Sequence, residues 1–532
     1  MNRPNIVLVV ADDLGYSDIG CYGGEIKTPN LDRIGRAGVR FSQFYNTARC
    51  SPSRASLLTG LHPHRTGIGI LTYDDGPGGY PGTLNDRCAT IAEVLGGQGY
   101  ATGLSGKWHL SSSLWEAEES WPTRRGFQHF YGTISGCGSY YDPGTLCRGE
   151  QDASADAQDP SFFYTDAIAE DAAAFIREKA EAQSPFFCYV AFTAPHWPLH
   201  APDEDVARYD GVYDVGWDEL REQRVARQRE EGLLGDESPL SERDPSQPAW
   251  ADAEHREWEA KRMQAYAAQV DRMDRGIGVI LDELAAQGIA DDTIVIFLSD
   301  NGGCAEELPQ GDVEVFRTRR QSVPAKTRDG RELRIGNYPD ITPGPEDTYA
   351  SYGRAWAGLS NTPFRFYKRW VHEGGIATPL IVHWPAGGLT GGKIVTTPFQ
   401  LTDVVPTLLE ITSAEYPGEG RDVAPLDGRS MLPALRGEES APAALYWEHI
   451  GNAAMRQEPW KLVREFPGEW ELYDIATDRS ELHDVAGEHP EVVAELSAAW
   501  EAWANDVGVI PREQILKLYG ERARQGLPVQ GT

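Results

Sequence analysis

The sequence predicts an α/β protein with a large, mostly parallel sheet flanked by helices, and a smaller C-terminal α+β domain that carries a short antiparallel sheet and a helix. Two observations support the large sheet. Short apolar runs alternate with helical stretches along most of the chain, and continuous runs are typical of strands buried on both faces. The expected strands are Ile6–Ala11, Ala101–Ser105, Phe186–Phe192, Thr293–Ser299 and Leu380–Trp384.

The helix and the C-terminal elements follow from residue spacing. Met263–Leu284 is the clearest helix, because its apolar residues recur every three or four positions. Beyond residue 432, three short strands and one helix are expected, at Ala453–Met455, Trp460–Val463, Trp470–Tyr473 and Pro490–Asp506. We therefore expect an α/β domain over residues 1–435, with an acidic insertion at 202–260 and a long loop at 306–350, and a C-terminal α+β subdomain over 436–532.

The charge balance restricts the possible partners. The 532 residues include 49 Lys or Arg and 81 Asp or Glu, which gives a net charge of −32. The hydrophobic fraction of 40% is sufficient for a large core, so a disordered acidic chain is excluded. Nucleic acid and anionic membranes attract basic surfaces, and neither is expected as a partner. Residues 202–260, with 18 acidic and 7 basic residues, are expected to be a solvated insertion.

The compartment is predicted from what the sequence lacks. No stretch reaches the roughly 20 apolar residues of a membrane span. The N-terminal run Ile6–Ala11 is too short for a signal peptide, and we interpret it as a strand. The seven cysteines are scattered and odd in number, which favours a reducing compartment. We expect a cytoplasmic monomer; a periplasmic or secreted protein would require a precursor segment missing from this sequence.

Polar residues follow four of the expected strands. They are Asp12-Asp13, Lys107-Trp108-His109, His196 and Asp300-Asn301. In open parallel sheets, ligands bind outside the carboxyl ends of the strands. Asp12, Asp13, Asp300 and Asn301 offer only oxygen ligands, which select calcium or magnesium over zinc. Each pair alone is also compatible with an ordinary turn or helix cap; their occurrence at two strand ends favours a metal site.

The segment from Cys50 to Gly60 is the most informative in the chain. Pro52 suits the first turn of a helix and Gly60 suits its end. Cys50 would then lie at the helix N-terminus, where the helix dipole favours anions and lowers the pKa of a thiol. A small buried residue is the alternative interpretation of such a cysteine.

The pattern Cys50-Ser51-Pro52-Ser53-Arg54, followed by Leu57-Leu58-Thr59-Gly60, resembles the modification motif of type I sulfatases. In this family, part of the alkaline-phosphatase-like superfamily, the Cys is converted to formylglycine. Among members, the sequence most resembles bacterial arylsulfatases, which bind calcium. The resemblance extends in order over Pro4–Gly15, Thr28–Leu31, Gly106–His109, Arg125–Phe127, Ala194–Leu199, Ser299–Gly303, Lys368–Pro379 and Trp460–Asp484.

The resemblance implies a role for each matching residue. Asp12, Asp13, Asp300, Asn301 and modified Cys50 would hold one divalent metal, Ca²⁺ or, as the alternative, Mg²⁺. Arg54 resembles the arginine that orients the formylglycine. The residues around the sulfate would be Lys107, His109, His196 and Lys368, the last identified by its position five residues before Glu373-Gly374-Gly375.

The implied reaction is hydrolysis of a sulfate monoester to an alcohol or phenol plus sulfate. The formylglycine hydrate would attack sulfur, form a covalent sulfated residue and then eliminate sulfate. His196, assisted by Lys368, would protonate the leaving oxygen, and His109 would serve the formylglycine hydroxyl. The expected partners are a small sulfated substrate and, transiently, a formylglycine-generating enzyme.

Three alternatives remain from the sequence. The same machinery could hydrolyse phosphate or phosphonate esters. A different class of protein, an inactive calcium-dependent binding protein, would not need intact Cys50, Arg54 and Lys107. A cysteine hydrolase would not need the metal carboxylates.

Two aromatic stretches, 139–142 and 356–364, have two possible interpretations: they could line the substrate pocket, or they could simply pack in loops.

Overall fold

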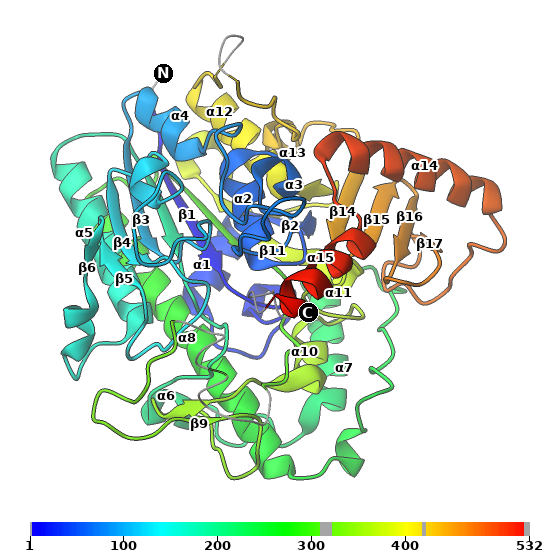
Figure 1. Ribbon diagram of the computed structural model, residues 1–532, viewed down its shortest axis with the longest axis horizontal. Coiled ribbons are helices and arrows are strands. Elements are labelled where there is room, and N and C mark those ends of the chain that lie inside the picture. Colours follow the sequence, from blue (N-terminus) through cyan, green and yellow to red (C-terminus); the bar gives the residue numbers. More distant parts are fainter. Residues whose placement is uncertain (1–2, 309–315, 317–321, 418–421, 526–532) are drawn as a thin grey trace.

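The computed structural model describes residues 3–308, 316, 322–417 and 422–525, and is built around one 11-stranded mixed sheet (Figure 1). The strand order is β12-β2-β11-β8-β1-β7-β3-β4-β5-β6, with β13 also paired to β2. The strands are β1 (Asn5–Ala11), β2 (Val39–Tyr45), β3 (Ala101–Gly106), β4 (His129–Thr133), β5 (Leu146–Arg148), β6 (Gln151–Asp152), β7 (Phe186–Ala191), β8 (Thr293–Ser299), β11 (Ala377–His383), β12 (Lys393–Val395) and β13 (Phe399–Gln400).

Strand β1 shows why the sheet has a core on each face. It is parallel to β7 on one side and to β8 on the other. Its side chains alternate between the two faces: Val7 and Val9 join one buried cluster, and Ile6 and Leu8 join the other. One face is covered by α1 (Pro29–Ala37), α5 (Tyr164–Glu181) and α8 (Arg256–Ala286), and the other by α2 (Cys50–Thr59), α4 (Ile91–Gly97) and α12 (Val404–Thr412).

The predicted large sheet with its helices is confirmed, and all five predicted strands are present, although their ends differ by a few residues. The expected parallel direction of Leu380–Trp384 is wrong. This segment lies in β11, which is antiparallel to both β2 and β8. A continuous apolar run reports burial on both faces, and it carries no information about strand direction.

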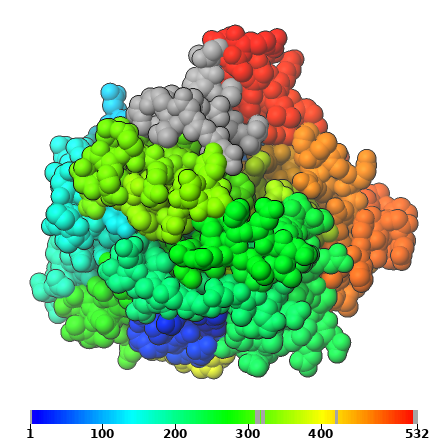
Figure 2. All heavy atoms as spheres, turned by 90° about the horizontal axis from the view of Figure 1, so that it is seen from below, coloured from blue at the N-terminus to red at the C-terminus, as the bar shows by residue number. Residues whose placement is uncertain are grey.

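Among the remaining elements of the α/β part, α6 (Asp203–Ala207), α7 (Gly216–Glu230) and β9 (Arg334–Ile335) lie at one end of the molecule, whereas α3 (Pro63–Thr66) and α13 (Leu432–Arg436) lie near α2 (Figure 1). The acidic segment 202–260 contains two helices and the start of α8, and segment 306–350 contains a pair of two-residue strands. In Figure 2 the green and yellow-green segments, which include α7 and α8, occupy the middle of the face that is seen from below. The α/β part also contains β10 (Thr348–Tyr349), α10 (Gly353–Ser360) and α11 (Glu373–Ile376).

The C-terminal part forms a second, antiparallel sheet of four strands. They are β14 (Leu445–His449), β15 (Asn452–Gln457), β16 (Trp460–Arg464) and β17 (Glu471–Asp474). Helix α14 (Pro490–Val507) packs on this sheet through Leu496 and Trp500. A further helix, α15 (Arg512–Arg524), was not predicted; it leaves the small sheet and returns to the large domain (Figure 1). No helix within the described ranges is both long enough and apolar enough to cross a membrane.

A buried ionic cluster joins the two sheets. Lys461 on β16 lies 2.8 Å from Glu373, the first residue of α11, and 2.8 Å from Glu481. Arg479 also pairs with Glu373, at 2.9 Å. Burial alone would raise the pKa of Glu373, but Lys461 and Arg479 outweigh it and lower that pKa to about 2. Glu373 therefore remains ionised and ties α11 to the small sheet.

Substitution of Lys461 by methionine is expected to destabilise the protein by about 3–5 kcal/mol, because it leaves buried carboxylates without their shared cation. Urea unfolding of the variant and the wild type measures this difference. Lys393→Met, at an exposed position on β12, is the matched control and is expected to stay close to the wild type. Equal stability of the two variants would show that the cluster contributes nothing.

Candidate active site

The polar residues after the central strands meet at one edge of the sheet. Strands β8, β1, β7 and β3 are consecutive and parallel, so their carboxyl ends lie side by side. The backbone N–H of Asp12, after β1, donates to the carbonyl of Ala194, after β7 (3.0 Å). The N–H of Asp13 donates to Oδ1 of Asp300, after β8 (3.3 Å). Parallel pairing thus assembles residues that are almost 290 positions apart in sequence.

Two lysines contact the aspartates at this edge. Nζ of Lys107 donates to Oδ2 of Asp12 (2.5 Å), and Nζ of Lys368 donates to both carboxylate oxygens of Asp13 (2.7 and 3.0 Å). All four side chains are buried. Lys368, which the sequence places only by its spacing from Glu373, therefore lies in the same cluster as Lys107.

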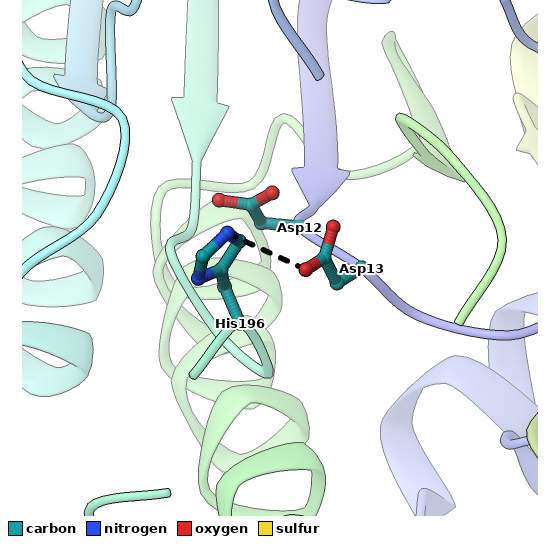
Figure 3. A group of neighbouring side chains, drawn as sticks. All are labelled: Asp12, Asp13 and His196. Atoms are coloured by element: carbon teal, nitrogen blue, oxygen red, sulfur yellow. Dashed lines mark ion pairs between the residues drawn. The ribbon is translucent and has the colours of Figure 1, made fainter. Parts of the chain in front are cut away.

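Several oxygens of this cluster suit a divalent cation. Asp12, Asp13 and His196 each offer a ligand atom, and these atoms lie within 4.8 Å of one another (Figure 3). Asn301 donates its Nδ2 to Oδ1 of Asp13 (2.6 Å). In the described part of the chain, Oδ1 of Asp12 and Oδ1 of Asn301 are buried and have no hydrogen-bond partner. Buried acceptors without donors are costly, and hard oxygens of this kind are typical ligands of Ca²⁺ or Mg²⁺.

The pKa values reflect the crowding of three carboxylates. Burial and the neighbouring Asp12 raise the pKa of Asp300 to about 6, although Arg54 opposes this shift. Burial also raises the pKa of Asp13, but His196, Lys368 and Asn301 outweigh it, so that this pKa falls below its usual value. A divalent cation would favour the ionised form of all three carboxylates.

Helix α2 begins at Cys50 and ends at Thr59, as predicted, and the left-handed φ of Gly60 (72°) terminates it. Sγ of Cys50 lies 3.4 Å from Nδ1 of His109. Burial and the nearby Lys107 and Arg54 lower the pKa of His109 well below its usual value, so its imidazole is neutral. A neutral imidazole beside residue 50 can accept a proton from a nucleophile there.

Arg54 lies one helical turn after Cys50 and points to the acidic cluster. Its Nε donates to Oδ2 of Asp300 (2.8 Å), and its Nη1 donates to the carbonyl of Lys107 (3.2 Å). Its side chain is fully buried. Arg54 thus connects α2, which begins at Cys50, with the ends of β8 and β3.

His196 lies on the loop after β7 and faces Asp13, with Nε2 at 3.4 Å from Oδ2 (Figure 3). Its Nδ1 contacts the carbonyl of Trp197 (2.6 Å). Burial lowers the pKa of His196 to about 3, so the imidazole is neutral at pH 7. The carbonyl contact then assigns the proton to Nδ1.

Tyr140 is a positioning residue that the sequence analysis placed only among possible pocket walls. Its hydroxyl donates to the carbonyls of Thr193 and His196, each at 2.8 Å, and the residue is buried. Trp356, in the other proposed wall, is buried and packs against Trp217 and Trp250. Tyr140 and Trp356 therefore pack inside the protein, which agrees with loop packing and not with a wall of the substrate pocket. A single tyrosine in a loop gives no sequence signal for such a contact.

Comparison with known proteins identifies the family. The family model described as Sulfatase matches residues 4–414. The chain belongs to the sulfatase family. A second model, N-sulphoglucosamine sulphohydrolase, C-terminal, matches residues 364–505. The predicted type I sulfatase family, of the alkaline-phosphatase-like superfamily, is confirmed, and the protein is a sulfuric ester hydrolase.

Individual relatives resemble this sulfatase over most of its length. An uncharacterized sulfatase of Schizosaccharomyces pombe is 33% identical and the match covers 96% of this chain and 94% of the relative. The arylsulfatase of Klebsiella aerogenes is 34% identical over 78% of this chain and 87% of its own. The solved structure of Ps i-CgsB in complex with k-i-k-neocarrahexaose superposes with a TM-score of 0.67 at 25% identity, covering 94% and 93% of the two chains.

Proposed function

We propose that this sulfatase hydrolyses sulfate monoesters of small alcohols or phenols, and that its nucleophile is a formylglycine hydrate made from Cys50. The observation that carries the proposal is the position of Cys50. It lies at the buried start of α2, 3.4 Å from a neutral His109, while Arg54 of the same helix contacts Asp300 in the acidic cluster. Family membership adds a general expectation of a metal and of formylglycine.

Asp12, Asp13, Asp300, Asn301 and modified Cys50 would hold the metal. Ca²⁺ is the proposed ion and Mg²⁺ the alternative, because four of these residues offer carboxylate or amide oxygens. When bound, the ion draws charge off the sulfate oxygens and polarises the hydroxyl at position 50. The site would have an excess of two positive charges, counted over three carboxylates, one divalent ion and the cations Arg54, Lys107 and Lys368. This local excess accommodates an anionic ester although the whole chain has a net charge of −32.

The chain's own residues would perform the proton transfers. His109 accepts the proton of the attacking hydroxyl, while Lys107 and Lys368 hold sulfate oxygens. The new oxygen–sulfur bond forms as the ester oxygen–sulfur bond breaks. Lys368, which contacts Asp13 and carries a proton, supplies it to the leaving oxygen. His196, which also contacts Asp13, takes this role only after a proton reaches its Nε2, because its own proton lies on Nδ1. After His109 has released the first proton to solvent, the second hydroxyl of residue 50 gives its proton to His109, the bond between the other oxygen of residue 50 and its carbon breaks, and sulfate leaves as the aldehyde is restored.

Parallel assays test the reaction class. Nitrophenyl sulfate, phosphate and phosphonate esters are compared at equal enzyme concentration, with the Cys50→Ala variant as the blank for each ester. We expect the highest kcat/KM for the sulfate, and only a minor activity on the others. A higher kcat/KM for either phosphorus ester would replace this proposal by a phosphate or phosphonate hydrolase.

A further inference from the structure

Three arginines from distant parts of the chain gather beside the proposed catalytic residues. Arg49 precedes Cys50, Arg369 follows Lys368, and Arg512 is the first residue of α15. None of the three belongs to the residues that the sequence analysis assigned to the sulfate or the metal. Two of them are adjacent in sequence to such a residue, and the third lies on the helix that packs toward Cys50.

Helix α15 reaches the catalytic region through apolar contacts. Ile515 and Tyr519 belong to the same buried cluster as Cys50, Ile70 and Tyr80. The backbone N–H of Ile510, just before the helix, donates to the hydroxyl of Tyr80 (2.7 Å). These contacts hold the first turns of α15, which begins at Arg512, close to Cys50 at the N-terminus of α2.

Backbone contacts bring Arg369 to the same place. Its N–H donates to the carbonyl of Ala48 (2.8 Å), and its carbonyl accepts from Nδ2 of Asn452 (2.9 Å). Gly451, in the turn just before β15, lies so close to α15 that a Cβ on it would be 2.9 Å from Cβ of Arg512. Arg369 and Arg512 thus both lie beside the β14–β15 turn.

The positive charges of this group are only partly compensated. Arg49 pairs with Glu306 (3.0 Å). Among the described residues, neither Arg369 nor Arg512 makes a side-chain hydrogen bond or ion pair. Burial, together with the neighbouring cations Arg49 and Arg512, lowers the pKa of Arg369, although Glu306 opposes this shift. Among the ion pairs of the described residues, only the pair of Arg49 with Glu306 involves one of these three arginines.

A neighbouring histidine does not relieve this excess. His449, at the end of β14, is buried, and its Nδ1 has no partner in the described structure. Burial and the nearby Arg49 and Arg369 lower the pKa of His449 well below its usual value, so it is neutral. Its unpartnered nitrogen can contact a ligand that enters the arginine group.

The group lies next to both residues proposed to serve the leaving oxygen. Arg369 directly follows Lys368. Glu306, the partner of Arg49, also accepts from Nε1 of Trp197 (3.1 Å), and Trp197 directly follows His196. A substituent on the leaving group would therefore be close to the arginines when its sulfate is held by Lys107 and Lys368.

We propose that Arg369 and Arg512, together with Arg49, form a second anion-binding subsite, which takes a carboxylate or sulfate group carried by the leaving group. This inference rests on the proposed function, and it narrows the substrate class to sulfate esters with a second oxyanion. Guanidinium groups suit this role because they bind carboxylate and sulfate oxygens through paired N–H donors.

Three aryl sulfates with nearly the same phenol test the subsite. They are 3-(4-sulfooxyphenyl)propionate, its methyl ester, and 2-(4-sulfooxyphenyl)ethanesulfonate. We expect the wild-type kcat/KM to be about tenfold or more higher for a charged probe than for the methyl ester. A factor of this size corresponds to the free energy of one hydrogen bond to a charged group. The propionate and the sulfonate distinguish a carboxylate from a sulfate-like ligand.

Variants assign the preference to the arginines. The preference is the kcat/KM for a charged probe divided by the kcat/KM for the methyl ester. Arg369→Ala and Arg512→Ala are each expected to lower this ratio by about tenfold. Arg369→Lys keeps a positive charge and is expected to retain part of the preference. Arg436→Ala, at an exposed position on α13, should keep the wild-type ratio. Calorimetric binding of the same probes to the Cys50→Ala variant should show the same preference without turnover.

The outcomes separate this inference from the proposed function. The subsite would be overturned if the wild type hydrolysed all three probes rapidly and with equal kcat/KM. It would also be overturned if the arginine variants lost the same factor in kcat/KM on all three probes. Either result would leave the sulfatase reaction intact. Hydrolysis of none of them by enzyme whose formylglycine is verified by mass would overturn the proposed mechanism, and the subsite with it.

Discussion

Replacement of Cys50 by alanine is expected to abolish sulfate ester hydrolysis, with a loss in kcat on the order of 10⁴ or more. Alanine cannot be converted to formylglycine and carries no nucleophile, whereas Lys107, His109 and Lys368 would still surround the sulfate. Turnover of nitrophenyl sulfate at saturating concentration measures the loss. The small side chain fits the space of the buried thiol, so the fold is expected to persist.

Two further variants make this result specific. Cys147→Ala removes another buried thiol, on strand β5, and is expected to keep wild-type activity. Cys50→Ser keeps a hydroxyl but lacks the second hydroxyl that allows elimination of sulfate, and is expected to stall after one turnover. The mass of the peptide spanning residue 50 distinguishes thiol from aldehyde in the wild type. Normal turnover by Cys50→Ala would exclude the proposed nucleophile.

Removal of divalent cations is expected to reduce activity to background and to lower the stability of the fold. Asp12, Asp13 and Asp300 lie together and are buried, and a bound cation offsets their mutual repulsion. A ligand present at about 100 times its Kd stabilises the folded state by about 2.7 kcal/mol. Dialysis against a chelator, followed by titration with Ca²⁺ or Mg²⁺, measures both recovered activity and the shift in Tm.

The matched variants for the metal are Asp12→Asn and Glu501→Gln. The first keeps the shape of a proposed ligand and removes its charge, and is expected to weaken Ca²⁺ binding by at least about tenfold. The second removes a carboxylate from the exposed surface of α14 and should leave Ca²⁺ binding unchanged. Full activity of the chelated enzyme, with no metal detected by elemental analysis, would rule out a metal-dependent reaction.

The strands of the central sheet and the polar residues that follow four of them could be predicted from local sequence, whereas the roles of the site residues were inferred from the family resemblance. The apolar run Ile6–Ala11 followed by Asp12-Asp13 indicates a buried strand that ends in oxygen donors. Pro52 and Gly60 mark the bounds of α2. In both cases the signal lies within about ten neighbouring residues, because burial alternation and helix capping act over that range.

Contacts between distant segments were decided only by tertiary packing. The direction of β11 depends on which neighbours it pairs with, and its apolar sequence suits either direction. Helix α15 presents only two buried residues, Ile515 and Tyr519, so its amphipathic signal is weak. Its stability comes from packing against the segment that contains Ile70 and Tyr80. That packing also brings Arg512 close to Arg369. No local pattern predicts this proximity, because the two residues are far apart in the sequence and meet only in the folded protein.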